Sequence, residues 1–146
     1  MSFGAVLSVR DIGKSSRFYQ RVLGYEQRFT LPRAGGGLTL AVLGFGASNL
    51  LLGRLDELHY EHAVRARKIR RGPHGLGITL TLVVSDVDQI YKAARKAQAE
   101  ILLKPTDEFY GDRVCMFLDP DGYEWKVSKP LRHVSVDEVK QFVSRL

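Results

Sequence analysis

The chain has 146 residues, of which 45% are hydrophobic and 26% charged, an ordinary globular composition that excludes a disordered or fibrous protein. This length allows one compact domain, or two half-size modules that share a core, and it leaves no room for a separate catalytic domain. The net charge of +6 favours anionic ligands or nucleic acid over cationic partners through long-range attraction.

The sequence contains no apolar run near the ~20 residues that span a bilayer, and residues 1–4 lack the basic and apolar regions of a signal peptide. The single cysteine, Cys115, lies in an apolar stretch and has no partner for an internal disulfide. We therefore expect a cytoplasmic protein with no membrane partner, in which Cys115 is a buried strand residue.

The first half begins with an apolar segment at 6–9, which predicts a strand, followed by Asp11 and a helix that runs to Leu23. Asp11 can accept hydrogen bonds from the free amides of the first helical turn, and Gly24 is suited to end the helix. Three further strands are predicted, separated by glycine-rich turns, at residues 25–30, 38–43 and 49–52. The first half is therefore predicted to be a βαβββ module.

Residues 54–76 are polar and predict a solvated linker or flap. The segment carries five basic residues, namely Arg65, Arg67, Lys68, Arg70 and Arg71. These charges would attract phosphates without sequence preference, so non-specific nucleic-acid binding through this linker is one alternative function. No helix-turn-helix, zinc-finger or RNA-binding signature accompanies the charge, which argues against nucleic acid as the partner.

The second half repeats the order of the first. A strand ending near Val84 is followed by Asp86 and a helix to Ala97, and then by strands at 99–103, 113–118 and 123–127. Asp86 lies 75 residues after Asp11, about half the chain, and this spacing indicates an internal duplication. The sequence Asp-Pro-Asp-Gly at 119–122 predicts a tight turn between the last two strands.

The tail contains a short helix whose start, from Ser135 to Glu138, has the spacing of a capping box. The fold class is therefore α+β, with two βαβββ modules and a C-terminal helix. The predicted parts are a first module at 1–53, a basic linker at 54–76, a second module at 77–129 and a helical tail at 130–146.

Several stretches together resemble the vicinal-oxygen-chelate superfamily of glyoxalases, bleomycin-resistance proteins and extradiol dioxygenases. The matching stretches are Val9-Arg10-Asp11, Phe18-Tyr19, Leu23-Gly24, residues 84–87, residues 110–113 and residues 117–125. The resemblance covers nearly the whole chain. It implies a cupped eight-stranded mixed sheet, built as two four-stranded sheets with helices outside, that surrounds a cavity, and it commonly implies a homodimer.

Metal-dependent members of that superfamily place histidine or glutamate at four strand positions, which correspond here to Gly4, Leu51, Thr79 and Lys126. None of these is a usual ligand, and a charged lysine has no lone pair and repels a divalent ion. We therefore predict no metal and no cofactor. The alternative is a metal site with displaced ligands, in which Glu124, the best candidate for a catalytic residue, acts with His74 or His59.

Side chains alternate across a strand, so the first strand of each module directs every second residue into the predicted cavity. The candidate ligand-binding residues are Val6, Ser8, Phe45, Thr79, Thr81, Phe109, Tyr110, Arg113, Glu124 and Lys126. Glu124 and Lys126 share a face and form either a charge pair or a solvated rim. The aromatic residues stack on a ligand or pack in the core, and Arg113 holds an anionic group or a neighbouring turn.

The leading hypothesis is a glyoxalase/bleomycin-resistance-like protein that binds or sequesters a small aromatic or anionic molecule without a metal. The runner-up is a metal-dependent lyase or dioxygenase of the same superfamily. The positive net charge argues against a cationic glycopeptide as the ligand. Whether modules pair within one chain or between two chains stays open at this point.

Overall fold

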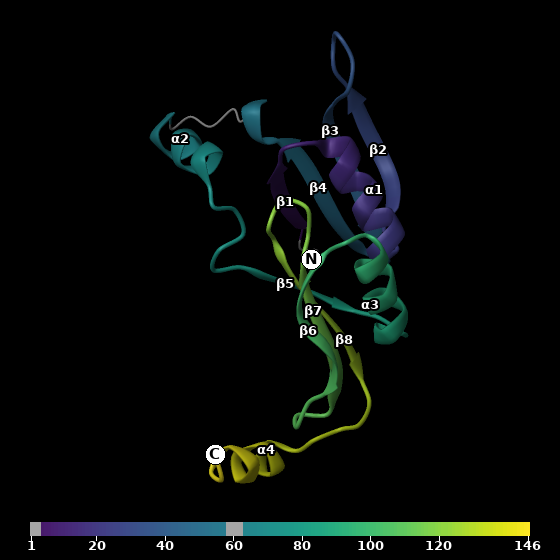
Figure 1. The fold of residues 1–146 in the computed structure, drawn as a ribbon, viewed down its shortest axis with the longest axis vertical. Helices are drawn as coiled ribbons and strands as arrows, with labels where there is room; N and C mark the ends of the chain where they lie inside the picture. The colour runs from purple at the N-terminus through teal and green to yellow at the C-terminus, as the bar shows by residue number, and fades with distance from the viewer. Residues whose placement is uncertain (1–3, 58–62) are drawn as a thin grey trace. The chain divides into compact units, whose positions relative to one another are not determined.

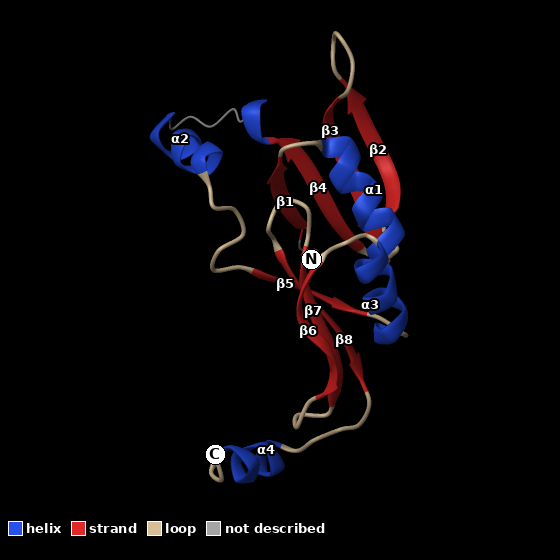
Figure 2. Cartoon of the chain, in the orientation of Figure 1, coloured by secondary structure: helices blue, strands red, loops and turns tan. Residues whose placement is uncertain are grey.

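The computed structural model describes residues 4–57 and 63–146, and in these ranges it contains eight strands and four α-helices (Figures 1 and 2). The first half comprises β1 (Gly4–Val9), α1 (Ile12–Leu23), β2 (Glu26–Pro32), β3 (Leu38–Phe45), β4 (Ser48–Arg54), a short 3-10 helix (Leu55–Glu57) and α2 (Ala63–Arg71). The second half comprises β5 (Thr79–Val83), α3 (Val87–Lys96), β6 (Glu100–Asp107), β7 (Asp112–Leu118), β8 (Glu124–Pro130) and α4 (Val136–Val143).

The strands form two four-stranded sheets with equivalent orders, β1-β4-β3-β2 and β5-β8-β7-β6. In each sheet the first strand pairs in parallel with the last strand of its module, and the other pairs are antiparallel. The shared topology confirms the predicted α+β class with two βαβββ modules and a C-terminal helix.

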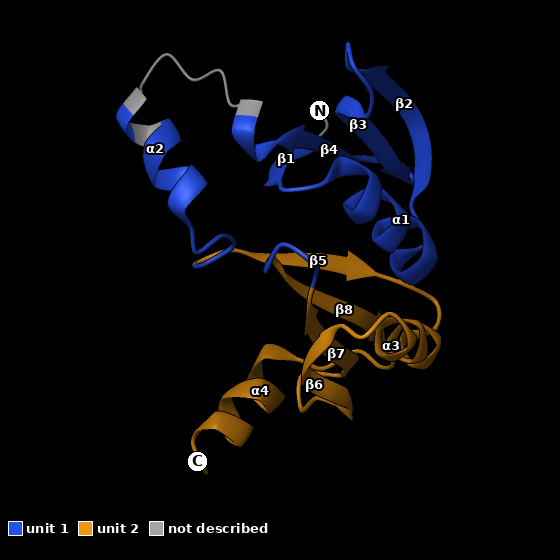
Figure 3. Cartoon of the chain, turned by 45° about the horizontal axis from the view of Figure 1, so that its top comes forward, with its two compact units in different colours: residues 1–76, 119–122 blue, residues 77–118, 123–146 orange. Residues whose placement is uncertain are grey.

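The described chain forms two compact units (Figure 3). The first comprises residues 1–76 together with 119–122, and the second comprises residues 77–118 and 123–146. The Asp-Pro-Asp-Gly turn between β7 and β8 is therefore part of the first unit, although the strands that it joins belong to the second.

In the first unit, α1 packs against one face of its sheet. Asp11 caps the helix by accepting a hydrogen bond from the Lys14 N–H at 2.9 Å, and Gly24 ends it with a φ of 74°. The buried residues of α1 are Ile12, Ser15, Ser16, Phe18, Tyr19, Val22 and Leu23. The sheet residues Leu7 and Val9 are also buried, as the alternation along β1 predicts.

In the second unit, α3 covers the face of the sheet that carries Trp125, which is buried. Asp86 caps this helix by accepting from the Gln89 N–H at 3.0 Å. Cys115 is buried on β7, with its thiol 4.0 Å from the Val87 carbonyl oxygen, and burial raises the pKa of that thiol to about 11. The prediction of a buried strand cysteine is confirmed.

The β7–β8 turn binds the buried side of α1 through two buried carboxylates. Asp121, 5% exposed, accepts hydrogen bonds from the Ser15 hydroxyl at 2.7 Å and from the Arg10 N–H at 2.9 Å. Asp119, 6% exposed, accepts from the Tyr19 hydroxyl. The sequence predicted only a tight turn here, so this role of the two carboxylates is a new finding.

The basic segment differs from the predicted solvated linker because it includes α2. Alanine, arginine and lysine are among the strongest helix formers, and no glycine or proline interrupts them before Gly72. Ala66 is buried, whereas the basic side chains Arg67, Lys68, Arg70 and Arg71 are exposed. None of the described helices is both long and apolar enough to span a membrane.

The C-terminal helix begins as the sequence predicts. The Glu138 N–H donates to the Ser135 hydroxyl at 3.2 Å, and the Ser135 N–H donates to the Glu138 carboxylate at 2.8 Å. This reciprocal pair is the predicted capping box, and it lowers the pKa of Glu138. None of the residues of α4 is buried.

Candidate functional site

Each sheet has a second face that its helix does not cover, and most residues assigned to the cavity lie on these open faces. Val6 is 67% exposed in the first unit, and Val83 is 60% exposed in the second, where Thr79 and Thr81 are exposed as well. Ser8 departs from the pattern because it is buried.

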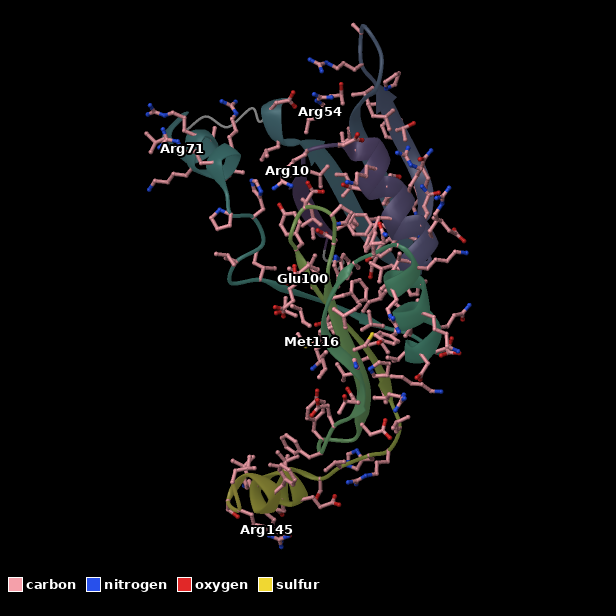
Figure 4. All side chains as sticks on the ribbon, in the orientation of Figure 1. Arg10, Arg54, Arg71, Glu100, Met116 and Arg145 are labelled. Atoms are coloured by element: carbon pink, nitrogen blue, oxygen red, sulfur yellow. The ribbon has the colours of Figure 1, made fainter. Side chains whose placement is uncertain are left out.

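The strand register brings four polar residues of the second sheet together. Thr79 of β5 lies opposite Glu124 of β8, and Thr81 lies opposite Lys126. On the other side of β8, Met116 of β7, which is labelled in Figure 4, lies opposite Lys126 in the strand register. Because directly opposite residues point to the same side of a sheet, these side chains share the open face.

Glu124 is oriented by its neighbour on β5. The Thr79 hydroxyl donates to one Glu124 carboxylate oxygen at 2.7 Å, and the side chain of Glu124 is half-buried. In the part of the chain that the structure describes, Glu124 has no other hydrogen-bond partner and no cationic partner. Its second oxygen is therefore available to accept a hydrogen bond from a ligand.

Lys126 interacts with an aromatic ring and not with Glu124. Its ammonium nitrogen lies 5.0 Å from the centroid of the Tyr110 ring, a cation–π distance. No carboxylate among the described residues pairs with it. The predicted charge pair between Glu124 and Lys126 is wrong, because Glu124 accepts from Thr79 and Lys126 contacts Tyr110. The open face therefore carries an ammonium group without a carboxylate partner and a carboxylate without a cationic partner among the described residues.

Tyr110 belongs to an aromatic group that reaches the C-terminal helix. The Phe109 and Tyr110 rings meet edge to face with centroids 5.3 Å apart. The Phe109 ring stacks on the Phe142 ring of α4, with centroids 4.3 Å apart and an angle of 7° between the ring planes. Phe109 is therefore engaged with α4, and Tyr110 is the member of this group that contacts Lys126. A depression of about 500 Å³ next to Tyr110 is lined by Asp112 and residues 130–134.

Gly111 allows the tail to pass close to the aromatic group. Its φ of 97° favours glycine, and a Cβ added there would lie 2.5 Å from the Arg132 carbonyl oxygen. The Gly111 carbonyl oxygen accepts hydrogen bonds from the Leu131 and Arg132 N–H groups at 2.9 and 3.2 Å. A side chain at this position would therefore displace the tail from Tyr110.

Arg28 places a positive charge on the open face of the first sheet, and sequence reasoning missed it. Its guanidinium donates to the Asn49 side-chain oxygen at 2.6 Å and to the Gly46 carbonyl at 2.5 Å. It crosses Gly44 so closely that a Cβ there would lie 1.8 Å from the Arg28 Nε. A glycine inside a strand was the available signal, because such glycines mark close approaches.

Two predicted ligand-binding residues lie on the helix-covered faces. Arg113 donates to Asp88 of α3 at 2.7 and 2.9 Å and to Asp107 at 2.5 Å, so it binds neighbouring protein structure, as one of its two interpretations predicts. This contact raises the pKa of Arg113 and lowers that of Asp88. Phe45 packs against Tyr25, with ring centroids 5.7 Å apart, next to the end of α1.

Residues 4–127 match the sequence model of a protein family described as the Glyoxalase/Bleomycin resistance protein/Dioxygenase superfamily. The chain belongs to this superfamily. Among its relatives is the uncharacterized protein Mb0911c of Mycobacterium bovis, 34% identical over 141 residues that cover 94% of this chain and 89% of that protein. The uncharacterized protein Rv0887c of Mycobacterium tuberculosis is 34% identical over 141 residues, 94% of this chain and 79% of that protein.

Solved structures agree with this membership at the level of the fold. TioX from Micromonospora sp. ML1 has a TM-score of 0.71 and 21% identity, covering 90% of this chain and 99% of that one. A glyoxalase/bleomycin resistance protein/dioxygenase family enzyme from Burkholderia phytofirmans PsJN has a TM-score of 0.68 and 21% identity, and the match covers 87% of this chain and 96% of that one. At these identities the likeness shows a shared fold alone.

The residues at the superfamily's metal positions do not fit a divalent ion. Gly4 and Thr79 begin β1 and β5, whereas Leu51 lies on β4 and Lys126 on β8. Within residues 4–57 and 63–146, no three histidine, cysteine, aspartate or glutamate side chains gather closely enough to hold a metal. This donor set lacks the converging lone pairs that a divalent cation requires.

His74, one of the two histidines named as displaced ligands, bonds to α2 and not to Glu124. Its Nε2 donates to the Ile69 carbonyl oxygen at 2.5 Å. His59, and its neighbour His62, lie outside the described residues. His133 is exposed in the tail.

Proposed function

We propose that this superfamily member binds or sequesters a small aromatic or anionic molecule on the open face of its second sheet, without a metal. The observation that carries the proposal is the Lys126 ammonium, which lies over the Tyr110 ring and has no carboxylate partner among the described residues. A lysine in this state offers a charge-assisted hydrogen bond to an anionic group.

The neighbouring side chains support a ligand with both a ring and polar substituents. Tyr110 offers an aromatic surface, and Glu124, held by Thr79, offers an acceptor for a hydroxyl or N–H group. The Lys126 ammonium over the Tyr110 ring favours an aromatic acid over a cationic ligand.

Homodimerisation and a cytoplasmic location are part of the same proposal. Large apolar side chains, Val6, Phe29, Leu31 and Val83, are exposed in the single chain, and such surfaces are typical of interaction sites. Sedimentation of the purified protein tests this part, and a monomer at micromolar concentration contradicts it.

The ligand proposal is tested with aromatic carboxylates such as naphthoate and with the matching neutral amides. Calorimetric titration should show binding of the acids and weaker binding of the amides. Lys126→Met should weaken acid binding by about tenfold or more, since it removes a charged hydrogen-bond donor. Lys129→Met, on the same strand, is the matched control. Equal effects of the two variants would contradict the proposal.

Metal analysis separates this function from a metal-dependent lyase or dioxygenase of the superfamily. The protein purified without chelators should carry no stoichiometric transition metal. A stoichiometric metal that disappears in Glu124→Ala would establish the enzyme alternative instead.

A further inference from the structure

A second site lies on the helix side of the second unit, in a groove of about 640 Å³ between α3 and β6. Asp88, Tyr91, Lys92, Arg95 and Lys96 line it from α3, and Lys104 lines it from β6. Arg113, on the helix-covered face of β7, also borders it, so the groove is on the opposite side of the sheet from Glu124 and Lys126.

The side chains that line the groove carry more positive than negative charge. Lys92, Arg95, Lys96 and Lys104 are all exposed, and none forms an ion pair within the described part of the chain. The acidic residue on the groove wall is Asp88, and both of its carboxylate oxygens accept hydrogen bonds from Arg113. Asp88 is therefore bonded to Arg113, and Lys92 also lowers its pKa, so this carboxylate is shared between two of the five cations that line the groove.

The spacing of the cations aligns them along the groove. Lys92 and Lys96 are four residues apart on α3, and so are Tyr91 and Arg95, which places each pair on adjacent turns of the helix. Like charges at this spacing destabilise a helix slightly, so an anionic occupant would relieve the repulsion. The Arg95 guanidinium lies 6.0 Å from the Tyr91 ring centroid, which leaves an aromatic ring beside the cations.

We propose that this groove binds a small molecule that carries several phosphate groups and an aromatic base, of the nucleoside polyphosphate class. The excess of cations over the single carboxylate of Asp88 in the groove lining suits a ligand with several negative charges, and Tyr91 provides a ring for base stacking. The volume is in the range of small-molecule sites, roughly 300–1,000 Å³. One aromatic ring in a bounded groove fits one base better than a nucleic-acid strand, which stacks successive bases.

The test is calorimetric titration of the full chain with ATP at low and high salt. ATP should bind, and the affinity should fall with salt. In Lys92→Gln/Lys104→Gln the dissociation constant should rise at least tenfold. The matched control Lys14→Gln/Arg17→Gln removes the same charge from exposed positions of α1 and should change it less than twofold.

Two further measurements make the outcome decisive. Tyr91→Leu should weaken binding of ATP but not of inorganic tripolyphosphate, because only ATP has a base to stack. Naphthoate, the probe of the sheet-face site, should not compete with ATP for the groove, so failure of the groove and failure of the sheet-face site are distinguishable. Absence of ATP binding, equal losses in groove and control variants, or a single-stranded oligonucleotide that binds the groove where ATP does not would each overturn the proposal.

Discussion

The Ser15 hydroxyl donates a hydrogen bond to Asp121 at 2.7 Å, although the two residues are 106 positions apart in the chain. Asp121 also accepts from the Arg10 N–H, so a buried carboxylate at the β7–β8 turn is bonded to the beginning of α1. A buried acid is tolerated only when such donors replace water. Removal of the carboxylate leaves those donors unsatisfied.

Asp121→Ala should therefore destabilise the protein by about 2–4 kcal/mol, the usual cost of leaving buried partners of a charged group unpaired. Urea denaturation measures the change in the free energy of unfolding. Asp137→Ala, at an exposed position of α4, is the control and should change it by less than about 0.5 kcal/mol. Similar values for the two variants would contradict this role of Asp121.

Gly111→Ala should destabilise the protein by about 2 kcal/mol or more, because it combines a positive φ with a clash against the Arg132 carbonyl. Gly35→Ala is a matched control, since Gly35 has a φ of 87° but nothing within 4 Å of an added Cβ. The difference between the two midpoints of urea unfolding isolates the clash. Limited proteolysis should cut the tail of the Gly111 variant faster, and unchanged cleavage would refute the effect on the tail.

Stability should decline as the pH rises above about 9. Burial raises the pKa of Cys115 to about 11 and that of Tyr25 to about 12. In the unfolded chain both groups lose their protons at lower pH, so the native state holds more protons across this window and unfolding becomes easier. The midpoints of urea unfolding at pH 7, 9 and 10.5 measure this loss of stability. Cys115→Ala should lose less stability over the same pH range.

The same burial predicts a slow thiol reaction. At pH 8 a disulfide reagent should modify native Cys115 far more slowly than the unfolded protein, since the thiolate is the reacting form. Rapid labelling without unfolding would contradict the buried position of this side chain.

The ion pair between Arg113 and Asp88 should make part of the stability sensitive to acid. Arg113 lowers the pKa of Asp88, so the stabilisation is present above the ordinary carboxyl pKa and is lost as the pH falls below about 4. Arg113→Lys lacks the planar pair of donors and should show a smaller loss of stability between pH 6 and pH 3. An identical pH profile for both proteins would show that the pair contributes nothing.

Much of the fold follows from patterns that extend over only a few residues. Asp11, Asp86 and Ser135 cap the helices that they precede, because a cap needs only the next three amides. Alternation along β8 places Glu124 and Lys126 on one face, since side chains alternate by strand geometry alone. The superfamily could also be identified from the sequence, because its motifs are short runs of neighbouring residues that occur in a characteristic order.

Partnerships between distant residues were decided by the tertiary structure. Lys126 pairs with Tyr110 and not with Glu124, and Arg113 turns to Asp88 and Asp107 on the helix-covered side. Neither partner can be deduced from spacing, because several residues of suitable chemistry compete for each charge. Local periodicity determined which residues share a face, whereas the choice among these competitors, and the burial of Asp121 beside Ser15, depended on how the folded chain packs.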